Sequence, residues 1–335
     1  MPSRDSTSSR RTTIYDLADL AGTSPSAVSS VLNGSWKKRR ISQKLAEKIT
    51  RIAEEQGYSV NIQASVLRRE KSNIIGMLIP KYDNRYFGAI AEQFETMARA
   101  RGLFPVITCT QRDPDLEIAA AKELLSYQVD CLIATGATDP DRISALCSAA
   151  GVRTINLDLP GTKAPSVISD NFAGARDLAN LILDHQETPS APLLFIGGRE
   201  SDHNTSERVR GFVAAHEDRG MSVDSSLILT CGYAAEKAEA ALTAFDGPVP
   251  RGLFVNSTIT LEGVVRWLYS QSREARAAIR YGCFDWDPFA ALLPANVGMA
   301  RQDVVSMLEL AFRLLDAEPD TVSSQQVPCV LTCLV

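Results

Sequence analysis

The sequence has 335 residues, more than one ordinary domain needs, so a small domain joined to a larger one, or a two-lobed domain, is expected. Hydrophobic residues make up 45% of the chain and charged residues 22%, which is typical of a soluble globular protein. The net charge of -5 argues against a nucleic-acid partner only as an average, because residues 1–72 contain 13 Lys and Arg against 7 Asp and Glu.

Residues 1–11 have the polar composition of a disordered tail and lack the apolar segment of an export signal. No later run approaches the length of a transmembrane helix. The seven cysteines lie in apolar stretches and include no C-x-x-C pair, which indicates reduced core residues and not a disulfide framework. We therefore expect a cytoplasmic protein without membrane contact.

Residues 12–59 carry the pattern of three short helices. Apolar residues at i, i+3, i+4 and i+7 predict a first helix that ends at Gly22. A second helix begins at Pro25 and stops at residues 33–34, and a third lies within residues 42–57. Two short helices joined by a Gly-containing turn form a helix-turn-helix, although a generic three-helix bundle would give the same pattern.

The residue types in these helices resemble the DNA-binding signature of the LacI/GalR (lactose-repressor) family. The resemblance is carried by residues 13–24, TIYDLADLAGTS, and 28–34, VSSVLNG. It implies that the second helix enters the major groove with Pro25, Ser26 and Ser30 at the base-reading positions. None of these side chains can read a guanine or adenine bidentately, so direct readout from this helix is expected to be weak.

Neighbouring residues are then expected to supply more of the DNA contact. Thr23, Ser29 and Asn33 lie on or beside the same helix. The following loop contains four cations that would neutralise phosphates: Lys37, Lys38, Arg39 and Arg40. The alternative is a solvated charge run without a partner. A loop lengthened by basic residues is similar to the fructose and sucrose regulators of the family.

Residues 60–72 resemble the family's hinge, in which one or two helical turns follow a Tyr, usually a Pro, and an Asn; here Val60 replaces the proline. So short a helix is unstable alone in water, so it should form only when paired with its dimer mate on DNA. Expected contacts are Asn61, Ala64 and Leu67. Leu67 aligns with a leucine that the family inserts into the minor groove, although it could equally be a core residue. Any change in the spacing of the paired hinges is expected to switch DNA binding.

Residues 73–335 alternate strand-like and helix-like runs, which predicts an α/β fold of parallel sheets covered by helices. The predicted strands are residues 74–79, 104–109, 131–135, 153–157, 166–169, 193–196, 252–255, 281–284 and 297–300. The resemblance implies an effector-binding and dimerisation domain with two periplasmic-binding-protein-like lobes. Their expected ranges are an N-lobe of about 73–165 plus 298–320, and a C-lobe of about 166–297 plus 321–335.

Ligands of open parallel folds bind beyond the carboxyl ends of the strands. The charged residues near predicted strand ends are Lys81, Arg85, Asp158, Asp202 and Asp285. The resemblance implies effector contacts for Asp285 too, and for Arg208, Tyr233, Ser257 and Gln302; Arg208 begins a segment similar to the family's R-x-x-G-F. Carboxylates and an arginine around an aromatic face suit a sugar. Lys81 and Arg85 favour a phosphorylated sugar, whereas Asp202 is as compatible with a free sugar or polyol.

Catalysis has little support in the sequence. His185, His203 and His216 lack metal-ligand spacing, and no P-loop or G-x-S-x-G occurs, so neither enzyme activity nor a metal or cofactor is expected. A transport protein of the same two-lobed fold would need an export signal and no helix-turn-helix, and a sugar kinase would need a nucleotide motif. We predict a sugar-responsive transcriptional regulator, most simply a repressor, that binds a palindromic operator. The absence of leucine heptads after the last strand-like run favours a homodimer over a tetramer.

Overall fold

The computed structural model describes residues 12–58, 71–186, 191–317 and 323–335. The chain divides into two compact units, residues 1–72 and 73–335. The division coincides with the boundary expected between the hinge and the effector-binding domain. Each unit has a hydrophobic core of its own.

The first unit is a bundle of three helices, α1 (Ile14–Ala21), α2 (Pro25–Leu32) and α3 (Gln43–Glu55). Thr13 begins α1 with a capping box, in which its hydroxyl accepts a hydrogen bond from the Asp16 amide and the Asp16 carboxylate accepts one from the Thr13 amide. Gly22 follows α1 with φ at 68°, a backbone conformation that glycine adopts without strain. Leu17 and Ile49 are almost completely buried in the core shared by the three helices.

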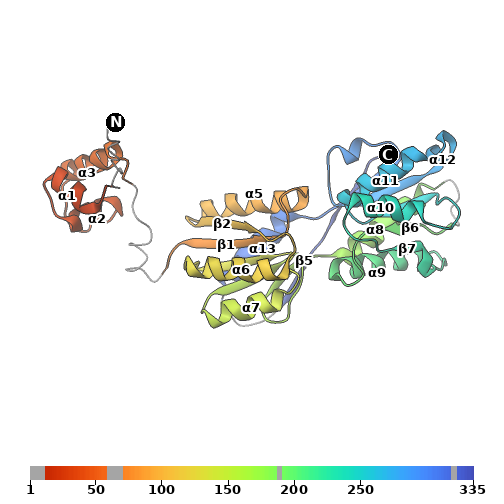
Figure 1. Ribbon diagram of the computed structural model, residues 1–335, viewed down its shortest axis with the longest axis horizontal. Coiled ribbons are helices and arrows are strands. Elements are labelled where there is room, and N and C mark those ends of the chain that lie inside the picture. The colour runs from red at the N-terminus through yellow and green to blue at the C-terminus, as the bar shows by residue number, and fades with distance from the viewer. Residues whose placement is uncertain (1–11, 59–70, 187–190, 318–322) are drawn as a thin grey trace, which may run out of the picture. The chain divides into compact units, whose positions relative to one another are not determined.

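The second unit begins with a lobe, the N-lobe, built on a six-stranded sheet (Figure 1). The strand order is β11-β5-β4-β3-β1-β2, and all neighbouring pairs are parallel. The strands are β1 (Ile74–Ile79), β2 (Phe104–Cys109), β3 (Cys131–Thr135), β4 (Arg153–Leu157), β5 (Ser166–Ser169) and β11 (Ser324–Val327). The α/β class predicted from the alternating pattern is confirmed.

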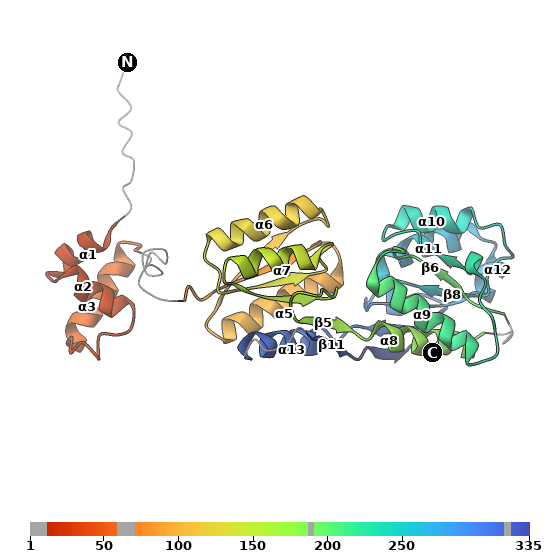
Figure 2. The same cartoon turned by 90° about the horizontal axis from the view of Figure 1, so that it is seen from below.

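Helices cover both faces of the N-lobe sheet, as Figure 2 shows. One face is covered by α5 (Arg85–Ala100) and α13 (Val304–Asp316), the other by α6 (Pro114–Ser126) and α7 (Pro140–Ala149). Side chains alternate along β1, so Ile75, Met77 and Ile79 pack in the first layer and Leu78 in the second. Burial on both faces is the reason that this strand is a continuous apolar run.

The C-lobe repeats this plan with the strand order β12-β10-β9-β8-β6-β7, in which only the β10–β12 pair is antiparallel. Its strands are β6 (Leu194–Ile196), β7 (Ile228–Leu229), β8 (Gly252–Val255), β9 (Arg280–Phe284), β10 (Asn296–Arg301) and β12 (Val330–Cys333). One face is covered by α8 (Asn171–Asp184) and α9 (His203–Glu217), the other by α10 (Ala235–Thr243) and α11 (Thr258–Ser270). The short helices are η1 (Ser225–Leu227), α12 (Arg273–Ala278) and η2 (Ala290–Leu292).

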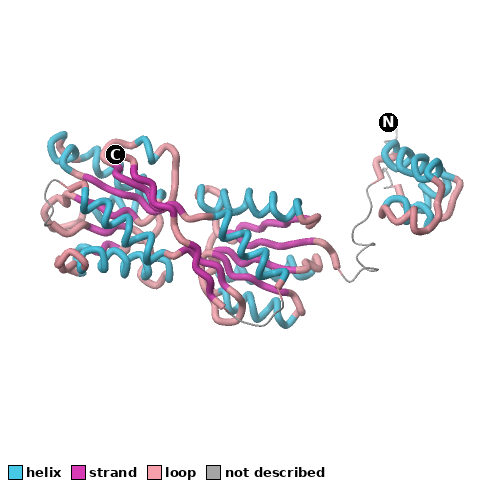
Figure 3. The backbone as a smooth tube through the Cα atoms, turned by 180° about the vertical axis from the view of Figure 1, so that it is seen from behind, coloured by secondary structure: helices cyan, strands magenta, loops and turns pink. Residues whose placement is uncertain are grey.

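The chain passes between the lobes after β5, after β10 and after β11. Figure 3 shows the strands that precede these passages running up to the junction of the lobes. The predicted lobe boundaries are therefore wrong by several residues. Strands β5 and β11 belong to the N-lobe sheet, and residues 298–301 of β10 belong to the C-lobe sheet. The carboxyl ends of the parallel strands face the junction, so the chain completes β5, β10 and β11 before it crosses.

All seven cysteines are free thiols. Cys147 and Cys283 are buried, but Cys333 is exposed, so the expectation of a core position is wrong for Cys333. Within the ranges that the structure describes, no helix combines the length and the apolar character needed to cross a membrane.

Candidate functional site

The helix expected to read DNA, α2, has a small polar surface. Ser24 caps the helix by accepting a hydrogen bond from the Ala27 amide, and Pro25 takes the first helical position. The predicted contact residues that reach the surface are Thr23, Pro25, Ser26, Ser29 and Asn33, of which Ser26 and Asn33 are the most exposed. These short side chains agree with the weak direct readout expected from the sequence.

Ser30 does not belong to this surface. Its side chain is only 5% exposed, and its hydroxyl donates a hydrogen bond of 2.8 Å to the carbonyl oxygen of Ser26. The loop after α2 folds back over it, and the Ser35 amide donates to the Ser30 carbonyl oxygen at 2.9 Å. The prediction that Ser30 reads bases is therefore wrong for this structure, because the residue is turned inward.

The basic loop after α2 is folded around Trp36. This side chain packs against the core of the first unit, and the Ile41 amide donates a 3.1 Å hydrogen bond to the Trp36 carbonyl oxygen. The loop's four cations, Lys37, Lys38, Arg39 and Arg40, are all exposed. In the described part of the chain none of them forms an ion pair with a carboxylate. Their charges are thus available to phosphates.

The hinge expected at residues 60–72 falls almost entirely outside the described residues. Tyr58, just before it, packs against the core of the first unit, and its amide donates to the Ala53 carbonyl oxygen at 2.8 Å. The roles of Asn61, Ala64 and Leu67 lie outside the described residues and stay predictions.

A cavity lies between the two lobes, at the carboxyl ends of their parallel strands; we call it the effector cavity. Eight of the nine residues expected at the effector site line it: Lys81, Asp158, Asp202, Arg208, Tyr233, Ser257, Asp285 and Gln302. They come from both lobes and follow seven different strands. Side chains that follow the carboxyl ends of the strands thus share one cavity.

Arg85 is the ninth residue, and it does not line the effector cavity. Its Nε atom lies 2.5 Å from Oδ2 of Asp287, which joins the first turn of α5 to the segment after β9 in the other lobe. The prediction of an effector contact for Arg85 is therefore wrong for this structure. Its charge is paired with the carboxylate of Asp287, which lies near Arg85 only in the folded protein.

The sequence reasoning also missed residues that line the effector cavity: Asn84, Tyr86, Phe87, Arg112, Arg199, Asn204 and Ile259. Arg112 follows β2 by three residues, so the strand-end argument would have found it. Tyr86 and Phe87 lie in the first turn of α5, and Asn204 in the first turn of α9, where the sequence has no feature that distinguishes them from capping or core residues.

Asp158 and Asp285 occupy matching positions in the two lobes. Asp158 follows β4 and Asp285 follows β9, with φ at 75° and 70°, a left-handed conformation that Asp tolerates better than most residues. Both are almost completely buried. Burial raises the pKa of both carboxyl groups, to about 6 for Asp158, although the nearby Arg112 and Arg208 oppose the shift.

One oxygen of each carboxyl group is held by the protein. Oδ1 of Asp158 accepts hydrogen bonds from Tyr86 Oη and Asn204 Nδ2, both at 3.0 Å. Oδ1 of Asp285 accepts one from Gln302 Nε2 at 2.6 Å. Among the described residues no donor is bonded to Oδ2 of either group. Two oxygens are thus available to accept hydrogen bonds from the hydroxyls of a ligand.

Arg208 is held on several sides. It is 3% exposed, Nε donates to Asn171 Oδ1, and Nη1 donates to the Asn256 carbonyl oxygen, each at 2.7 Å. Its guanidinium carbon lies 3.7 Å from the centre of the Phe284 ring. No acceptor from the described ranges is bonded to Nη2. The guanidinium is therefore fixed, keeps one donor unbonded, and lines the same cavity as the two carboxyl groups.

The glycine of the R-x-x-G-F segment has a packing role. A Cβ atom on Gly211 would lie 2.2 Å from the carbonyl oxygen of Phe172, so only glycine lets α9 approach α8 this closely. Because Arg208 is one turn earlier on α9 and Asn171 is next to Phe172 on α8, this approach sets the Arg208–Asn171 hydrogen bond.

Gln302 and Ser257 complete the polar lining. Gln302 lies in the second passage between the lobes, and its Oε1 accepts a hydrogen bond of 2.6 Å from the Ser169 hydroxyl. It thereby links Ser169 at the end of the N-lobe sheet to Asp285 in the C-lobe. Ser257 caps α11 by accepting a hydrogen bond from the Thr260 amide at 3.2 Å. Its hydroxyl therefore has a structural role whether or not it also contacts a ligand.

Tyr233 and Asp202 lie together at the cavity. The Tyr233 hydroxyl donates to Oδ2 of Asp202 at 2.8 Å. Burial and the Asp202 charge raise the pKa of Tyr233, so the phenol stays protonated. The guanidinium carbons of Arg112 and Arg199 lie 5.9 and 5.7 Å from the centre of its ring.

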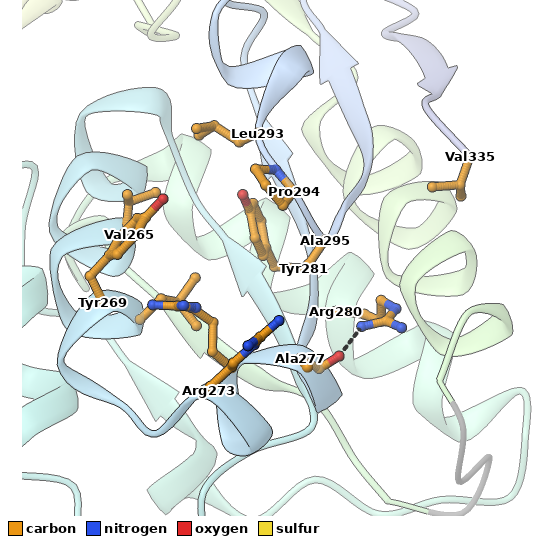
Figure 4. Close-up of a pocket in the computed structure, with 12 residues that line it drawn as sticks. Val265, Tyr269, Arg273, Ala277, Arg280, Tyr281, Leu293, Pro294, Ala295 and Val335 are labelled. Carbon is orange, nitrogen blue, oxygen red and sulfur yellow. Dashed lines mark hydrogen bonds between the residues drawn. The ribbon is translucent and has the colours of Figure 1, made fainter.

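A larger cavity, about 570 Å³, lies elsewhere in the C-lobe (Figure 4). Tyr269 near the end of α11, Tyr281 at the beginning of β9 and three arginines are among the residues that line it. It lies at the amino end of β9, opposite to the end where ligands of parallel folds bind. The effector cavity is therefore the better candidate site, in spite of its smaller volume.

No group of His, Cys, Asp or Glu side chains suited to hold a metal ion occurs among the described residues. His216 is buried, its Nε2 accepts a hydrogen bond from the Leu193 amide, and burial lowers its pKa. This histidine is therefore a neutral core residue.

Comparison with known proteins agrees with this division of the chain. Residues 13–61 match the family described as bacterial regulatory proteins, lacI family. Residues 72–315 match the family described as periplasmic binding proteins and sugar binding domain of LacI family.

The chain is also similar to individual proteins. It is 66% identical over 195 residues to the ribitol operon repressor of Klebsiella aerogenes, which covers 57% of this chain and 72% of that protein. It is 27% identical over 330 residues to the sucrose operon repressor of Klebsiella pneumoniae, covering 96% and 98% of the two chains. The crystal structure of the lac repressor dimer bound to operator and the anti-inducer ONPF matches with a TM-score of 0.79 at 21% identity, covering 96% of this chain and 98% of that one. At that identity the structural match shows a shared fold.

Proposed function

Because the chain belongs to the LacI family of bacterial regulatory proteins, we propose that it is a homodimeric repressor whose affinity for a palindromic operator changes when a small polyol occupies the effector cavity. Relatives of the chain are repressors of sugar and polyol operons. DNA binding and a sugar-binding domain are properties of the family. The operator symmetry, the effector and the residues that contact each are the parts that we propose.

For the DNA contact we propose that different residues of the first unit contact the bases and the phosphates. The exposed residues of α2, Ser26 and Asn33 above all, contact base edges with little discrimination. The four cations of the loop at residues 37–40 contact phosphates, and Trp36 holds the loop against the core. Specificity then depends more on the hinge and on the deformability of the DNA than on bidentate base recognition.

For the effector, the free oxygens of Asp158 and Asp285 and the fixed guanidinium of Arg208 carry the proposal. Hydroxyl groups both donate and accept hydrogen bonds, so adjacent hydroxyls can donate to the carboxylates and accept from the arginine. A ligand with several neighbouring hydroxyls fits this set better than an apolar one.

The cavity volume favours a small polyol. At about 60 Å³ the effector cavity is small, so a disaccharide is too large for it unless the lobes separate. The name of the 66% identical relative, ribitol operon repressor, points to the same class. We propose ribitol as the first compound to test.

Contacts between the lobes connect the cavity to the rest of the second unit. Asp158 in the N-lobe is bonded to Asn204 in the C-lobe, and Arg85 in the N-lobe is paired with Asp287 in the C-lobe. A ligand that replaces or reinforces such contacts favours one arrangement of the lobes, and its effect is limited to its difference in affinity for the two arrangements. We propose that the hinge, residues 60–72, transmits this change to the DNA-binding unit.

An electrophoretic mobility shift with palindromic sites from neighbouring polyol-uptake genes tests the proposal. The full-length protein should shift such a site with strong dependence on salt, and ribitol should change the shift. Asp285→Ala should keep the shift and lose the response, because Asp285 supplies a ligand acceptor and lies outside the DNA-binding unit.

Asp218→Ala is the matched control, since Asp218 is a C-lobe carboxylate half-exposed in an ion pair with Arg176. It should respond as the wild type does. No salt-sensitive binding to any such site would refute the DNA-binding part, and a normal response in Asp285→Ala would refute the assignment of the cavity.

A further inference from the structure

A second cavity, about 260 Å³, adjoins the effector cavity; we call it the outer cavity. The two share Arg112, Arg199 and Asp202 in their linings. Thr138 lines the outer cavity from the N-lobe, and His203 lines it from the C-lobe. A ligand in the effector cavity could therefore extend into the outer cavity past the two arginines.

The two shared arginines form no ion pair among the residues that the structure describes, although the charge of Arg112 acts on the buried Asp158. Neither Arg112 nor Arg199 has a carboxylate oxygen within 4.0 Å in those ranges. The Arg112 guanidinium donates a long hydrogen bond, 3.4 Å from Nη1 to the Gly136 carbonyl oxygen. Both guanidinium groups lie by the ring of Tyr233, one from each lobe. Two cations thus face one entrance without a carboxylate partner in the described part of the chain.

The backbone that presents Arg112 is strained. Gln111 and Arg112 have φ at 54° and 58°, two successive left-handed residues of which neither is glycine. Such conformations cost free energy and persist where the surrounding structure enforces them, often at ligand sites. Here they direct the residues after β2 towards the junction of the lobes.

The charges around the connected cavities also bear on an anionic ligand. The side chains that line them include three arginines, Arg112, Arg199 and Arg208, against three carboxylates, from Asp158, Asp202 and Asp285; a further cation, Lys81, is paired with Asp83 at 4.0 Å. Asp202 is already a hydrogen-bond acceptor for Tyr233 and Thr205. Burial raises the pKa of Asp158 to about 6 and also raises the pKa of Asp285, so both carboxyl groups lose their negative charge more readily than exposed aspartates do. An added anion could pair with Arg112 and Arg199, which have no carboxylate oxygen within 4.0 Å among the described residues.

Uncharged hydrogen-bond donors at the start of α9 also favour an anionic ligand. Helix α9 begins at His203, and the side chain of its N-cap residue, Asp202, forms no capping hydrogen bond. The Nε2 atom of His203 is enclosed and has no hydrogen-bond partner among the described residues. An anion in the outer cavity could accept hydrogen bonds from these groups at the positive end of the helix.

We propose that the outer cavity is an anion subsite, in which Arg112 and Arg199 bind a terminal phosphate or carboxylate of an effector whose hydroxyls occupy the effector cavity. The inference rests on the proposed function and refines it, because the effector becomes an anionic derivative of a polyol. Arg112 and Arg199 come from different lobes, so an anion between them would also hold the lobes together.

Calorimetric titration of the full-length protein with ribitol, ribitol 5-phosphate and ribonate tests this. An anionic compound should bind at least tenfold more tightly than ribitol, and the better of the two identifies the group as phosphate or carboxylate. Arg112→Gln and Arg199→Gln should each weaken binding of the anionic compound by about 10- to 100-fold, and should weaken binding of ribitol by much less. Arg210→Gln removes an exposed cation of α9 that is paired with Glu207, and should change neither affinity.

Equal affinities for all three compounds, or anion binding unaffected by both substitutions, would overturn the subsite and leave the proposed function intact. If none of the compounds binds, the proposed effector class fails, and inorganic phosphate tests the subsite alone. A saturable rise in unfolding temperature with phosphate, above that of chloride at equal ionic strength, should occur in wild type and Arg210→Gln. The rise should be absent from Arg112→Gln and Arg199→Gln, and its absence from wild type would overturn the subsite.

Discussion

Substitution of Gly211 tests how the packing of the second unit positions Arg208. In Gly211→Ala the new methyl group would lie 2.2 Å from the Phe172 carbonyl oxygen, so α8 and α9 must separate by about 1 Å. Overpacking costs about 1–3 kcal/mol. Weakening a hydrogen bond of the Arg208 guanidinium costs about 1.5–3 kcal/mol. The better helix propensity of alanine offsets at most about 1 kcal/mol of this loss in stability.

We therefore expect Gly211→Ala to lose about 2–5 kcal/mol of stability and to bind effector weakly, because Arg208 moves with α9. Gly88→Ala is the matched control, since its methyl group would meet only the Tyr82 carbonyl oxygen, at 3.8 Å, and its φ is not left-handed. That variant should gain about 0.4–1 kcal/mol. Differential scanning calorimetry and effector titration provide both readouts. Gly211→Ala with wild-type stability and effector affinity would refute the argument that close helix approach sets the site.

Three further predictions concern the pH, the first unit and the DNA contact. The raised pKa of Asp158, about 6, means that folding favours its protonated form; this contribution, up to about 3 kcal/mol, is present below pH 4 and is lost as the pH rises through 6. Unfolding of Asp158→Asn should therefore depend less on pH between 4 and 6 than that of the wild type, and identical profiles would contradict this. Leu17→Ala, at a residue 1% exposed, should cost about 3–5 kcal/mol, enough to unfold a unit of this size. Circular dichroism and titration should then show that DNA binding is abolished while effector binding is retained. Replacing Lys38 and Arg39 by glutamine should reduce the slope of log K against log salt for DNA binding by roughly 0.9 for each phosphate that is no longer neutralised, and an unchanged slope would show that these two side chains do not bind phosphates.

The sequence predicted the strands well because most of them are buried on both faces. Residues 74–79 and 131–135 form apolar runs that only a central strand of a covered sheet explains, and both strands have these bounds. Strands β7 and β11 were not predicted, because β7 has only two residues and β11, SQQV, has no apolar pattern. Strand β12 is the last strand-like run, for which no bounds were predicted. The pairing of β5, β11 and β12 decides where one lobe ends and the other begins.

The candidate site was predictable to the extent that strand ends define it. Asp158 and Asp285 were found because each directly follows a strand. Arg85 was misassigned because its partner Asp287 lies 202 residues later in the sequence, in the other lobe. Ser30 was misassigned because a loop of this chain folds over it, which a family resemblance does not reveal. Tertiary packing that the local sequence pattern does not encode accounts for both errors.

The central claim is that occupancy of the effector cavity and binding of operator DNA are coupled through one protein. The most direct test is to measure operator affinity with and without saturating effector by fluorescence anisotropy, and effector affinity with and without saturating operator by calorimetry. Coupling requires both ratios to be equal, and typical values are roughly 5- to 150-fold. We predict equal ratios in that range for the wild type and ratios of one for Asp285→Ala, which retains operator binding. A wild-type operator affinity that no effector changes, although effector binds, would contradict the account.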